Sequence, residues 1–487
     1  MTPTDLRLID GLRAAAGTLA ASLIDPADAE IANTMRIVLD ELHKRRDVAR
    51  YRAAHDEAAD LVAAGLALLG LPAENLPRFG DDVDGDIVRA AIDCVAKRLA
   101  ETVAALSDVD DAPAIALIDR ALAWEARLWR SNVGPAEASA AALDLAPENL
   151  AAYLAGRLPD GSPEIVAVAQ VPGGFSKITV LVTVRDGRGE HGIVLRAQKP
   201  VAPFYMDGAD VASEFEALRF LHAAGLPVAE PLWLEDDASR LGLRFLATTR
   251  LRGRNCGDFL GARETLPDGL VRELIATLAR IHAVPLDVGD PLLQRSHLGK
   301  WARHDRIADA TAHYVRYWHA IAERSQALSS PAVARGFAWL FANVPDDDAP
   351  TCLIHGDFGL HNVMVDDGRL AGVLDWEACH VGDPADELFL FTRALAPIAD
   401  PERIMAWYVE AGGTPISPRR LNYYAVLAAL KGPITGAGAL DLVASHPDLD
   451  LKATEVAYRF VQPSLEQMPA LIAAAEAARH HPFPVSE

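Results

Sequence analysis

The sequence has few cysteines, no long hydrophobic run and a shortage of basic residues. Its four cysteines, Cys94, Cys256, Cys352 and Cys379, are scattered along 487 residues without a C-x-x-C pair. This scatter argues against a disulfide framework or a cysteine-rich zinc site and favours reduced thiols. No stretch approaches the roughly 18 uninterrupted apolar residues that a membrane-spanning helix needs, so no membrane span is predicted.

The shortage of positive charge limits the partners. Lys and Arg number 46 against 68 Asp and Glu, which gives a formal net charge of −22. Binding to nucleic acid or to an anionic membrane surface requires clustered Lys and Arg, so neither partner is expected. Residues 1–30 lack a basic region before an apolar core and do not resemble a signal peptide. We therefore expect a cytoplasmic protein.

The length predicts more than one domain. Apolar residues recur at helical spacing through about the first 130 residues, where no glycine-rich phosphate loop occurs. We expect residues 1–140 to form an all-α bundle of unknown role. It could pack on the downstream domain or a partner, or it could gate substrate or mediate a homodimer. A linker is expected between Asn132 and Pro147, where Gly and Pro interrupt an Ala-rich run.

The period changes to that of strands at Glu164. A hairpin with Gly173 and Gly174 at its tip precedes Ser176 and Lys177, and such a tip can cover phosphates with backbone N–H groups. A Gly-Gly pair alone is more often a plain turn. The next strand ends near Arg196.

An amphipathic helix is predicted over 211–224. Its Glu214 is either a solvated carboxylate, the usual state of Glu, or the ion-pair partner of Arg196. We expect residues 141–253 to form a strand-rich N-lobe and residues 254–487 a helical C-lobe, which makes the fold class α+β. Six aromatic or histidine side chains in this C-lobe either pack in the core or wall an acceptor pocket: Trp301, His313, Tyr314, Tyr317, Trp318 and His319.

The most informative stretch runs from Leu353 to Glu377 and reads LIHGDFGLHNVMVDDGRLAGVLDWE. Asp357, Asn362 and Asp375 follow short apolar runs that are typical of buried strands ending in functional turns. The spacing H-x-D-x-x-x-x-N, a hairpin and then an Asp suits phosphoryl transfer to a hydroxyl. One carboxylate would meet the hydroxyl, while an amide and a second carboxylate would hold Mg²⁺ on nucleotide phosphates.

The order of these parts resembles the aminoglycoside phosphotransferase and choline kinase family, the small-molecule branch of the protein-kinase-like fold. The resemblance covers about residues 148–478 and is most specific in HGDFGLHN and DWE. The GGFSKIT hairpin and VLR strand are most similar to the subgroup that includes kinase domains fused to acyl-CoA dehydrogenases, which phosphorylate hydroxyacyl-CoA.

The resemblance implies a two-lobed fold and a role for each matched residue. Asp357 would orient the substrate hydroxyl and accept its proton, and His355 would brace the loop. Asn362 and Asp375 would ligate Mg²⁺. The phosphate side would be formed by Gly173, Gly174, Ser176, Lys177, Arg196 and Glu214.

Some features of the matched region leave alternatives. Arg196 stands where a strand lysine is usual, with Lys177 and Lys199 as nearby alternatives. Asp383 is expected to cap the helix that follows it, and the role of Glu377 is open. ATP is the expected nucleotide and GTP the alternative.

The leading hypothesis is an ATP- and Mg²⁺-dependent phosphotransferase acting on a hydroxyl of a small molecule such as a hydroxyacyl-CoA or another metabolite. One alternative is an antibiotic O-phosphotransferase acting on an aminoglycoside or macrolide. A second alternative is a nucleotide-binding pseudokinase or interaction module.

Overall fold

The computed structural model describes most of the chain: residues 48–79, 85–106, 112–129, 143–158, 163–171, 176–199, 209–258, 261–262, 266–325, 327–347, 349–396, 398–445 and 451–479. It divides into two compact units. The helical unit takes its residues from 1–139, 315–344 and 426–482, and the sheet unit from 140–314 and 345–425. The predicted domain boundaries at residues 140 and 253 stay predictions.

The helical unit is built from helices far apart in the sequence. They are α3 (Val48–Leu68), α4 (Gly85–Leu106), α5 (Ala112–Trp129), α12 (Pro331–Ala342) and α16 (Leu451–Arg479). Helix α4 packs on α3 and α12, and α5 packs on α16. Trp124 is buried and its indole N–H donates to the Ala54 carbonyl at 2.7 Å. The first helices thus share a core with late segments of the chain, because each amphipathic stripe must be buried against some partner.

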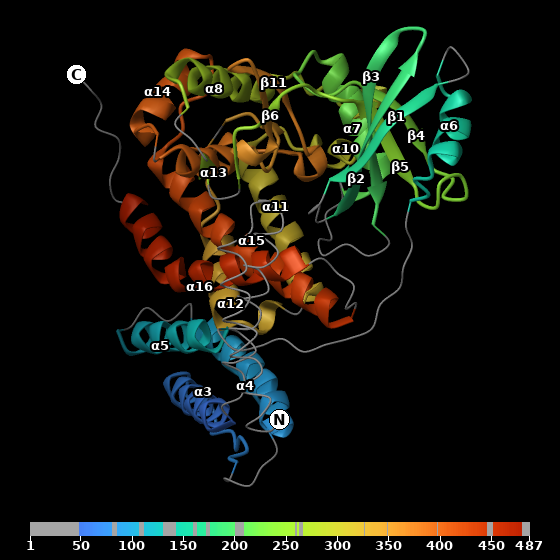
Figure 1. Ribbon diagram of the computed structural model, residues 1–487. Coiled ribbons are helices and arrows are strands. Elements are labelled where there is room, and N and C mark those ends of the chain that lie inside the picture. The colour runs from blue at the N-terminus through green and yellow to red at the C-terminus, as the bar shows by residue number, and fades with distance from the viewer. Residues whose placement is uncertain are drawn as a thin grey trace, which may run out of the picture. The chain divides into compact units, whose positions relative to one another are not determined.

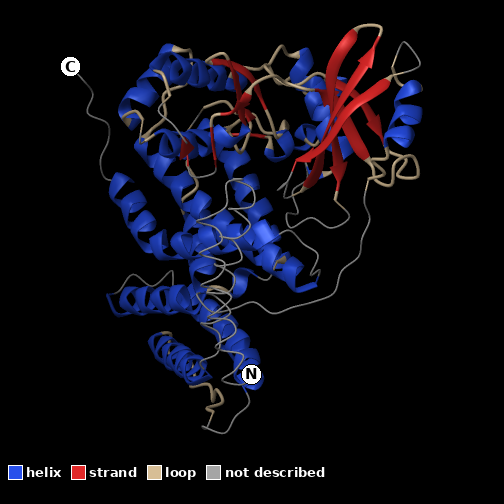
Figure 2. Cartoon of the chain, viewed as in Figure 1, coloured by secondary structure: helices blue, strands red, loops and turns tan. Residues whose placement is uncertain are grey.

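The sheet unit contains a five-stranded antiparallel sheet (Figures 1 and 2). Its strands follow the order β1-β2-β3-β5-β4. Their bounds are β1 (Glu164–Val171), β2 (Lys177–Asp186), β3 (Gly189–Gln198), β4 (Pro231–Glu235) and β5 (Phe245–Thr249). Helix α6 (Pro147–Ala155) supplies Leu150 and Leu154 to the core on one face of this sheet. Helix α7 (Val211–Ala223) packs on β3, β4 and β5.

The register of β2 and β3 separates core from polar side chains. Lys177 pairs with Gln198, and Thr179 pairs with Arg196. Because successive side chains of a strand point to opposite faces, Lys177 and Arg196 lie on the same face of the sheet. Val180 and its partner Leu195 lie on the other face, in the core with α6. One alternating pattern therefore places apolar side chains in the core on one face and two basic side chains on the other.

The second half of the sheet unit carries short strands and helices. The hairpin predicted after the HGD stretch is present as β10 (Val363–Asp366) and β11 (Arg369–Val373), and β6 (Arg254–Asn255) pairs with β10. Strand β9 (Cys352–Ile354) pairs with β12 (His380–Gly382). The helices and remaining short elements of this unit are α8 (Asp268–His282), α9 (Pro291–Arg295), α10 (Leu298–Trp301), α13 (Pro384–Leu395), α14 (Pro401–Glu410), β7 (Gly257–Asp258), β8 (Gly261–Ala262) and the 3₁₀ turns at Leu360–Asn362 and Trp376–Ala378. A further 3₁₀ turn at Ala327–Ser329 belongs to the helical unit. Two longer helices, α11 (Ile307–Arg324) and α15 (Pro418–Ser445), contribute residues to both units. None of the described helices has the length and apolarity to cross a membrane.

Gly253 permits the close approach of β6 to β10. Its φ of +91° lies in the left-handed region, and an added Cβ would overlap the Val365 carbonyl oxygen. The atoms that this Cβ would overlap belong to the backbone of β10, so no flexible side chain could move to relieve the clash.

Substitution of Gly253 by Ala should destabilise the sheet unit by about 2–4 kcal/mol, as a left-handed penalty and a backbone clash add. Gly225 offers a matched control, because its φ is +74° and an added Cβ would meet nothing within 4 Å. Gly225→Ala should cost only about 1–2 kcal/mol. Thermal and urea unfolding compare the two variants, and equal losses would contradict the clash.

Candidate active site

The loop after β9 carries His355 and Asp357. The His355 side chain is buried, its Nε2 donates to the Leu374 carbonyl at 2.8 Å, and its Nδ1 accepts from the Asp357 N–H at 3.2 Å. Between them, Gly356 has φ +85°, and a Cβ there would overlap the Ala378 carbonyl oxygen. The imidazole therefore links this loop to the end of β11, just before Asp375.

A buried carboxylate that the sequence reasoning missed holds the same loop from α13. Glu387 accepts from the Gly356 N–H at 2.8 Å and from the His355 N–H at 3.2 Å. It also bonds His282 Nε2 at 3.0 Å, and His282 Nδ1 lies 2.7 Å from the Tyr408 hydroxyl. Burial opposes ionisation, but the hydrogen bond and charge of His282 outweigh it and lower the pKa of Glu387.

The start of α13 is itself fixed. Asp383 caps it by accepting from the Ala385 N–H at 2.8 Å, which confirms the predicted cap. Both of its carboxylate oxygens also accept from the buried Arg420 guanidinium. The signal for Glu387 was present in the sequence as a Glu four residues after this cap, but nothing there indicated that it faces the loop.

Asp357 and Asn362 lie side by side. Asn362 Nδ2 donates to Asp357 Oδ2 at 2.9 Å and to the main-chain carbonyl of Asp357 at 3.0 Å. The main-chain carbonyl of Asn362 accepts from the Leu374 N–H at 2.8 Å. The Asp357 side chain is 44% exposed, whereas Asn362 is buried. Because the side-chain nitrogen of Asn362 donates to Asp357, its side-chain oxygen remains available to bind a metal ion.

Asp375 occupies a backbone conformation that is rare for residues with a side chain. Its φ of +63° places it in the left-handed region, two residues after the end of β11. Such conformations cluster at functional sites, where the surroundings impose them. The Asp375 side chain is 33% exposed, and its Oδ1 accepts from Arg196 Nη2 at 2.8 Å.

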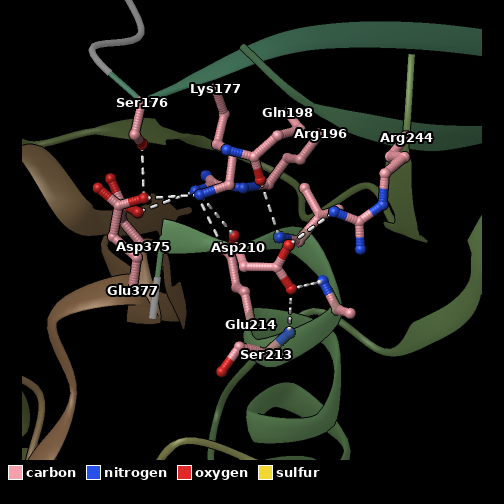
Figure 3. Close-up of polar contacts among 12 residues, drawn as sticks. Ser176, Lys177, Arg196, Gln198, Asp210, Ser213, Glu214, Arg244, Asp375 and Glu377 are labelled. Carbon is pink, nitrogen blue, oxygen red and sulfur yellow. Dashed lines mark hydrogen bonds and ion pairs between the residues drawn. The ribbon is translucent and has the colours of Figure 1, made fainter. Parts of the chain in front are cut away.

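The predicted strand cation and helix carboxylate meet. Arg196 Nη2 lies 3.0 Å from Glu214 Oε1, and Figure 3 shows both side chains pointing into one cluster with Asp375. The alternative of a solvated Glu214 is wrong, since the residue is 1% exposed. Gly173 and Gly174 lie outside the described residues, so their predicted role stays a prediction.

A second buried cation joins the cluster. Lys177 Nζ lies 2.8 Å from Glu377 Oε2 and 3.4 Å from Glu214 Oε2. Ser176 Oγ donates to Glu377 Oε2 at 2.5 Å (Figure 3). The sequence left the role of Glu377 open, and the structure places it as the anchor for the start of β2.

Contacts at the start of helix α7 fix the position of Glu214, which lies in its first turn. Asp210 caps it by accepting from the Ala212 and Ser213 N–H groups at 3.0 and 3.2 Å, and Arg244 Nη1 donates to its other oxygen at 2.8 Å. Gln198 Oε1 accepts from the Val211 N–H at 3.0 Å. Figure 3 shows these contacts beside the cluster.

The charges of the cluster are strongly coupled. Burial works against the charge of Arg196, but Glu214 and then Asp375 outweigh it and raise the pKa of Arg196. Burial would raise the pKa of Asp375, but Arg196 and then Lys177 lower it. The pKa of Glu377 is raised, first by burial and then by the negative charge of Asp375. With three carboxylates and two cations in contact, the ionised cluster carries one net negative charge.

The residues present fit a magnesium ion that relies on its substrate for ligands. Asn362 and Asp375 offer the oxygen atoms that Mg²⁺ prefers, and Mg²⁺ commonly takes one or two protein ligands with phosphates and water. Within the part of the chain that the structure describes, no group of three or more His, Cys, Asp or Glu could hold a metal ion. A dedicated all-protein metal cage is therefore absent from the described residues.

Packing explains part of the aromatic set of the C-lobe. Trp301, Tyr314 and Trp318 are buried, at 3%, 6% and 4% exposure. The Tyr314 ring stacks on His380 at 4.1 Å between centroids, and the Trp301 ring lies 4.7 Å from His313. An acceptor pocket walled by these residues stays a prediction.

Comparison with known proteins decides the family. The model of the phosphotransferase enzyme family matches residues 167–428, more than half of the chain. The chain belongs to this family. A predicted aminoglycoside phosphotransferase from Ralstonia eutropha has a similar crystal structure, with a TM-score of 0.51, 22% identity, and coverage of 68% of this chain and 98% of that one. This similarity confirms the two-lobed α+β fold.

Two curated relatives show where the sequence similarity lies. Acyl-CoA dehydrogenase family member 11 of Mus musculus is 30% identical over 247 residues, covering 49% of this chain and 30% of that protein. Hygromycin-B 4-O-kinase of Escherichia coli is 26% identical over 233 residues, covering 44% of this chain and 62% of that protein. This chain therefore matches under a third of the first relative's length and under two thirds of the second's.

Removal of the Glu387 carboxylate should unfix the loop. We expect Glu387→Ala to lower the free energy of unfolding by about 2–4 kcal/mol, because two backbone N–H groups and His282 lose an acceptor. Glu387→Gln retains one acceptor oxygen and should lose less. Urea unfolding near neutral pH measures both, and equal stability of Glu387→Ala and wild type would refute the clamp.

The same residue predicts a pH dependence. The pKa of folded Glu387 is below its usual value of 4.5, so its charged form stabilises the fold above that value. This contribution is lost as the pH falls through the folded pKa. The stability difference between wild type and Glu387→Gln should be constant near neutral pH and shrink below pH 4.5. A difference that stays constant into the acid range would contradict the lowered pKa.

Proposed function

We propose that this chain is an ATP- and Mg²⁺-dependent kinase that phosphorylates a hydroxyl group of a small molecule. The observation that carries the proposal is the exposed Asp357 carboxylate, held by Asn362 beside the left-handed turn of Asp375. Phosphoryl transfer needs a positioned acceptor and stabilised phosphate charge more than a strong base. Asp357 would accept a hydrogen bond from the acceptor hydroxyl and take its proton, while His355 holds the loop.

The phosphate side of the site would be formed by Arg196. Its side chain is 17% exposed, against 2% for Lys177, so Arg196 is the cation that a ligand can reach. A guanidinium group can donate two parallel N–H bonds to a phosphate. Lys177 would act as an internal strut between Glu214 and Glu377. Ser176 is 4% exposed and bonds Glu377, so its predicted contact with the phosphates stays a prediction.

The charge balance supports a metal requirement. A cluster with one net negative charge repels a polyphosphate unless a cation enters with it. Asn362 and Asp375 would hold Mg²⁺, which supplies positive charge to the phosphates when bound. ATP is the proposed nucleotide, and GTP is the alternative to be measured.

A metabolite is the preferred acceptor. Acyl-CoA dehydrogenase family member 11 matches at higher identity than hygromycin-B 4-O-kinase, 30% against 26%. The subgroup that the GGFSKIT hairpin resembles phosphorylates hydroxyacyl-CoA, so a hydroxyacyl-CoA is the first acceptor to test and an aminoglycoside the second. A cytoplasmic location and a homodimer through residues 1–140 stay predictions.

Asp357→Asn should lower kcat by about 10²–10⁴-fold with an unchanged nucleotide Kd, because an amide cannot take the proton of the reacting hydroxyl. ADP release would be measured with ATP and GTP across hydroxyacyl-CoA, sugar, choline and aminoglycoside acceptors. Asp367→Asn, an exposed position in the β10–β11 turn, is the control and should keep wild-type activity. Nucleotide binding by wild type without turnover on any acceptor would favour a pseudokinase.

Substitutions of Arg196 and Lys177 should have different effects, one on nucleotide binding and the other on stability. Arg196→Met should weaken nucleotide binding about tenfold or more, since hydrogen bonds to a charged group are each worth about 1.5–3 kcal/mol. Lys177→Met leaves two buried carboxylates short of a cation and should cost about 3–5 kcal/mol of stability. Calorimetric titration and thermal unfolding give both quantities. If Arg196→Met bound nucleotide as wild type does, and Lys177→Met stayed stable but bound it more weakly, then Lys177 would be the phosphate ligand in place of Arg196.

A further inference from the structure

A histidine in the catalytic loop has no role in the function proposed so far. His361 lies in the 3₁₀ turn Leu360–Asn362, and its Nε2 is 3.0 Å from Asp357 Oδ2. A carboxylate oxygen only accepts, so the Nε2–H donates. Its side chain is 15% exposed, well below the 44% of Asp357.

His361 and Asn362 bond the same oxygen. Asp357 Oδ2 accepts from His361 Nε2 at 3.0 Å and from Asn362 Nδ2 at 2.9 Å. No described residue forms a hydrogen bond to Asp357 Oδ1, and the side chain is partly exposed. Two donors on one oxygen fix the rotation of the carboxylate, so that the other oxygen remains for an incoming hydroxyl.

The local backbone makes room for this contact. Gly359 has φ −116° and ψ 163°, a conformation open to any residue. A Cβ at this position would lie 2.5 Å from both Cε1 and Nδ1 of His361, so a side chain there would displace the ring. The backbone of His361 is also held, because Asn255 Nδ2 donates to its carbonyl. Strand β6 and Gly359 thus together aim the imidazole at Asp357.

We propose that His361 is a positioning residue for phosphoryl transfer, acting by holding Asp357 Oδ2 so that Oδ1 faces the acceptor hydroxyl. This inference rests on the proposed kinase function. It assigns His361 no contact with substrate or metal. Its effect should therefore fall on kcat, while nucleotide affinity and the Mg²⁺ concentration for half-maximal activity stay as in wild type.

The experiment compares three substitutions in the full-length chain with the best acceptor found for wild type. His361→Leu should lower kcat about 10–100-fold, since misplacement of a reacting group by about 1 Å has an effect of this order. His361→Gln can still donate from its amide and should recover most of the activity. Gly359→Ala should behave like His361→Leu, because its Cβ displaces the ring without straining the backbone.

Gly269→Ala is the matched control, since a Cβ at this α8 position would meet nothing within 4 Å, and it should leave kcat unchanged. Unchanged ADP affinity, measured by calorimetry, separates a loss of positioning from a loss of folding. Wild-type kcat in both His361→Leu and Gly359→Ala would overturn the inference and leave the kinase function intact. Equal losses in His361→Gln and His361→Leu would also overturn it. A wild-type chain that phosphorylates no acceptor would overturn the proposed function and this inference with it.

Discussion

The buried charge cluster around Glu214 is the constraint on which the rest of the sheet unit depends. Each of its charges would cost several kcal/mol to bury alone, so each is tolerated only while its partners are in place. Lys177 and Arg196 reach it from neighbouring strands, and Asp375 and Glu377 reach it from the turn after β11. The strand register and the left-handed turn therefore have to be satisfied together.

A second buried carboxylate performs a related task for the catalytic loop. Glu387 accepts hydrogen bonds from two successive backbone N–H groups, those of His355 and Gly356. These bonds fix the backbone direction at the next residue, Asp357. Its own helix is anchored by the contact of Asp383 with Arg420. The exposed Asp357 thus stands on a scaffold of buried ionic contacts. This arrangement suits a group that must be held in position while remaining accessible to a hydroxyl.

The sequence predicted the parts of this site that are local in the chain. The β10–β11 hairpin and the cap at Asp383 follow from spacing and the matched motif, whereas the pairing of Glu214 with Arg196 is one of two alternatives that the sequence leaves open. The predicted family and two-lobed fold are confirmed by the family model and by the similar crystal structure. The hairpin and the cap can be predicted because each is formed by residues close together in the chain.

Contacts between residues far apart in the chain could not be predicted from the sequence alone. An amphipathic stripe states that a helix is covered, but not which segment covers it, so the packing of α5 on α16 could not be inferred. The same holds for Glu387, because a buried Glu and a solvated Glu look identical in a sequence. The sequence predicts a phosphate contact for Lys177, whereas its 2% exposure supports the proposed role as an internal strut, and burial of this kind cannot be read from a sequence.

The geometry also bears on why nucleotide and metal would enter together. In the structure Arg196 bonds Asp375 directly, so the cation proposed for the phosphates and the carboxylate proposed for the metal neutralise each other. A phosphate alone would compete with Asp375 for the guanidinium, and a metal alone would compete with the guanidinium for the carboxylate. A metal–nucleotide complex offers each of them a partner of opposite charge at once, so neither is left unpaired in a partly buried site. The ion pair therefore favours joint binding over either ligand alone.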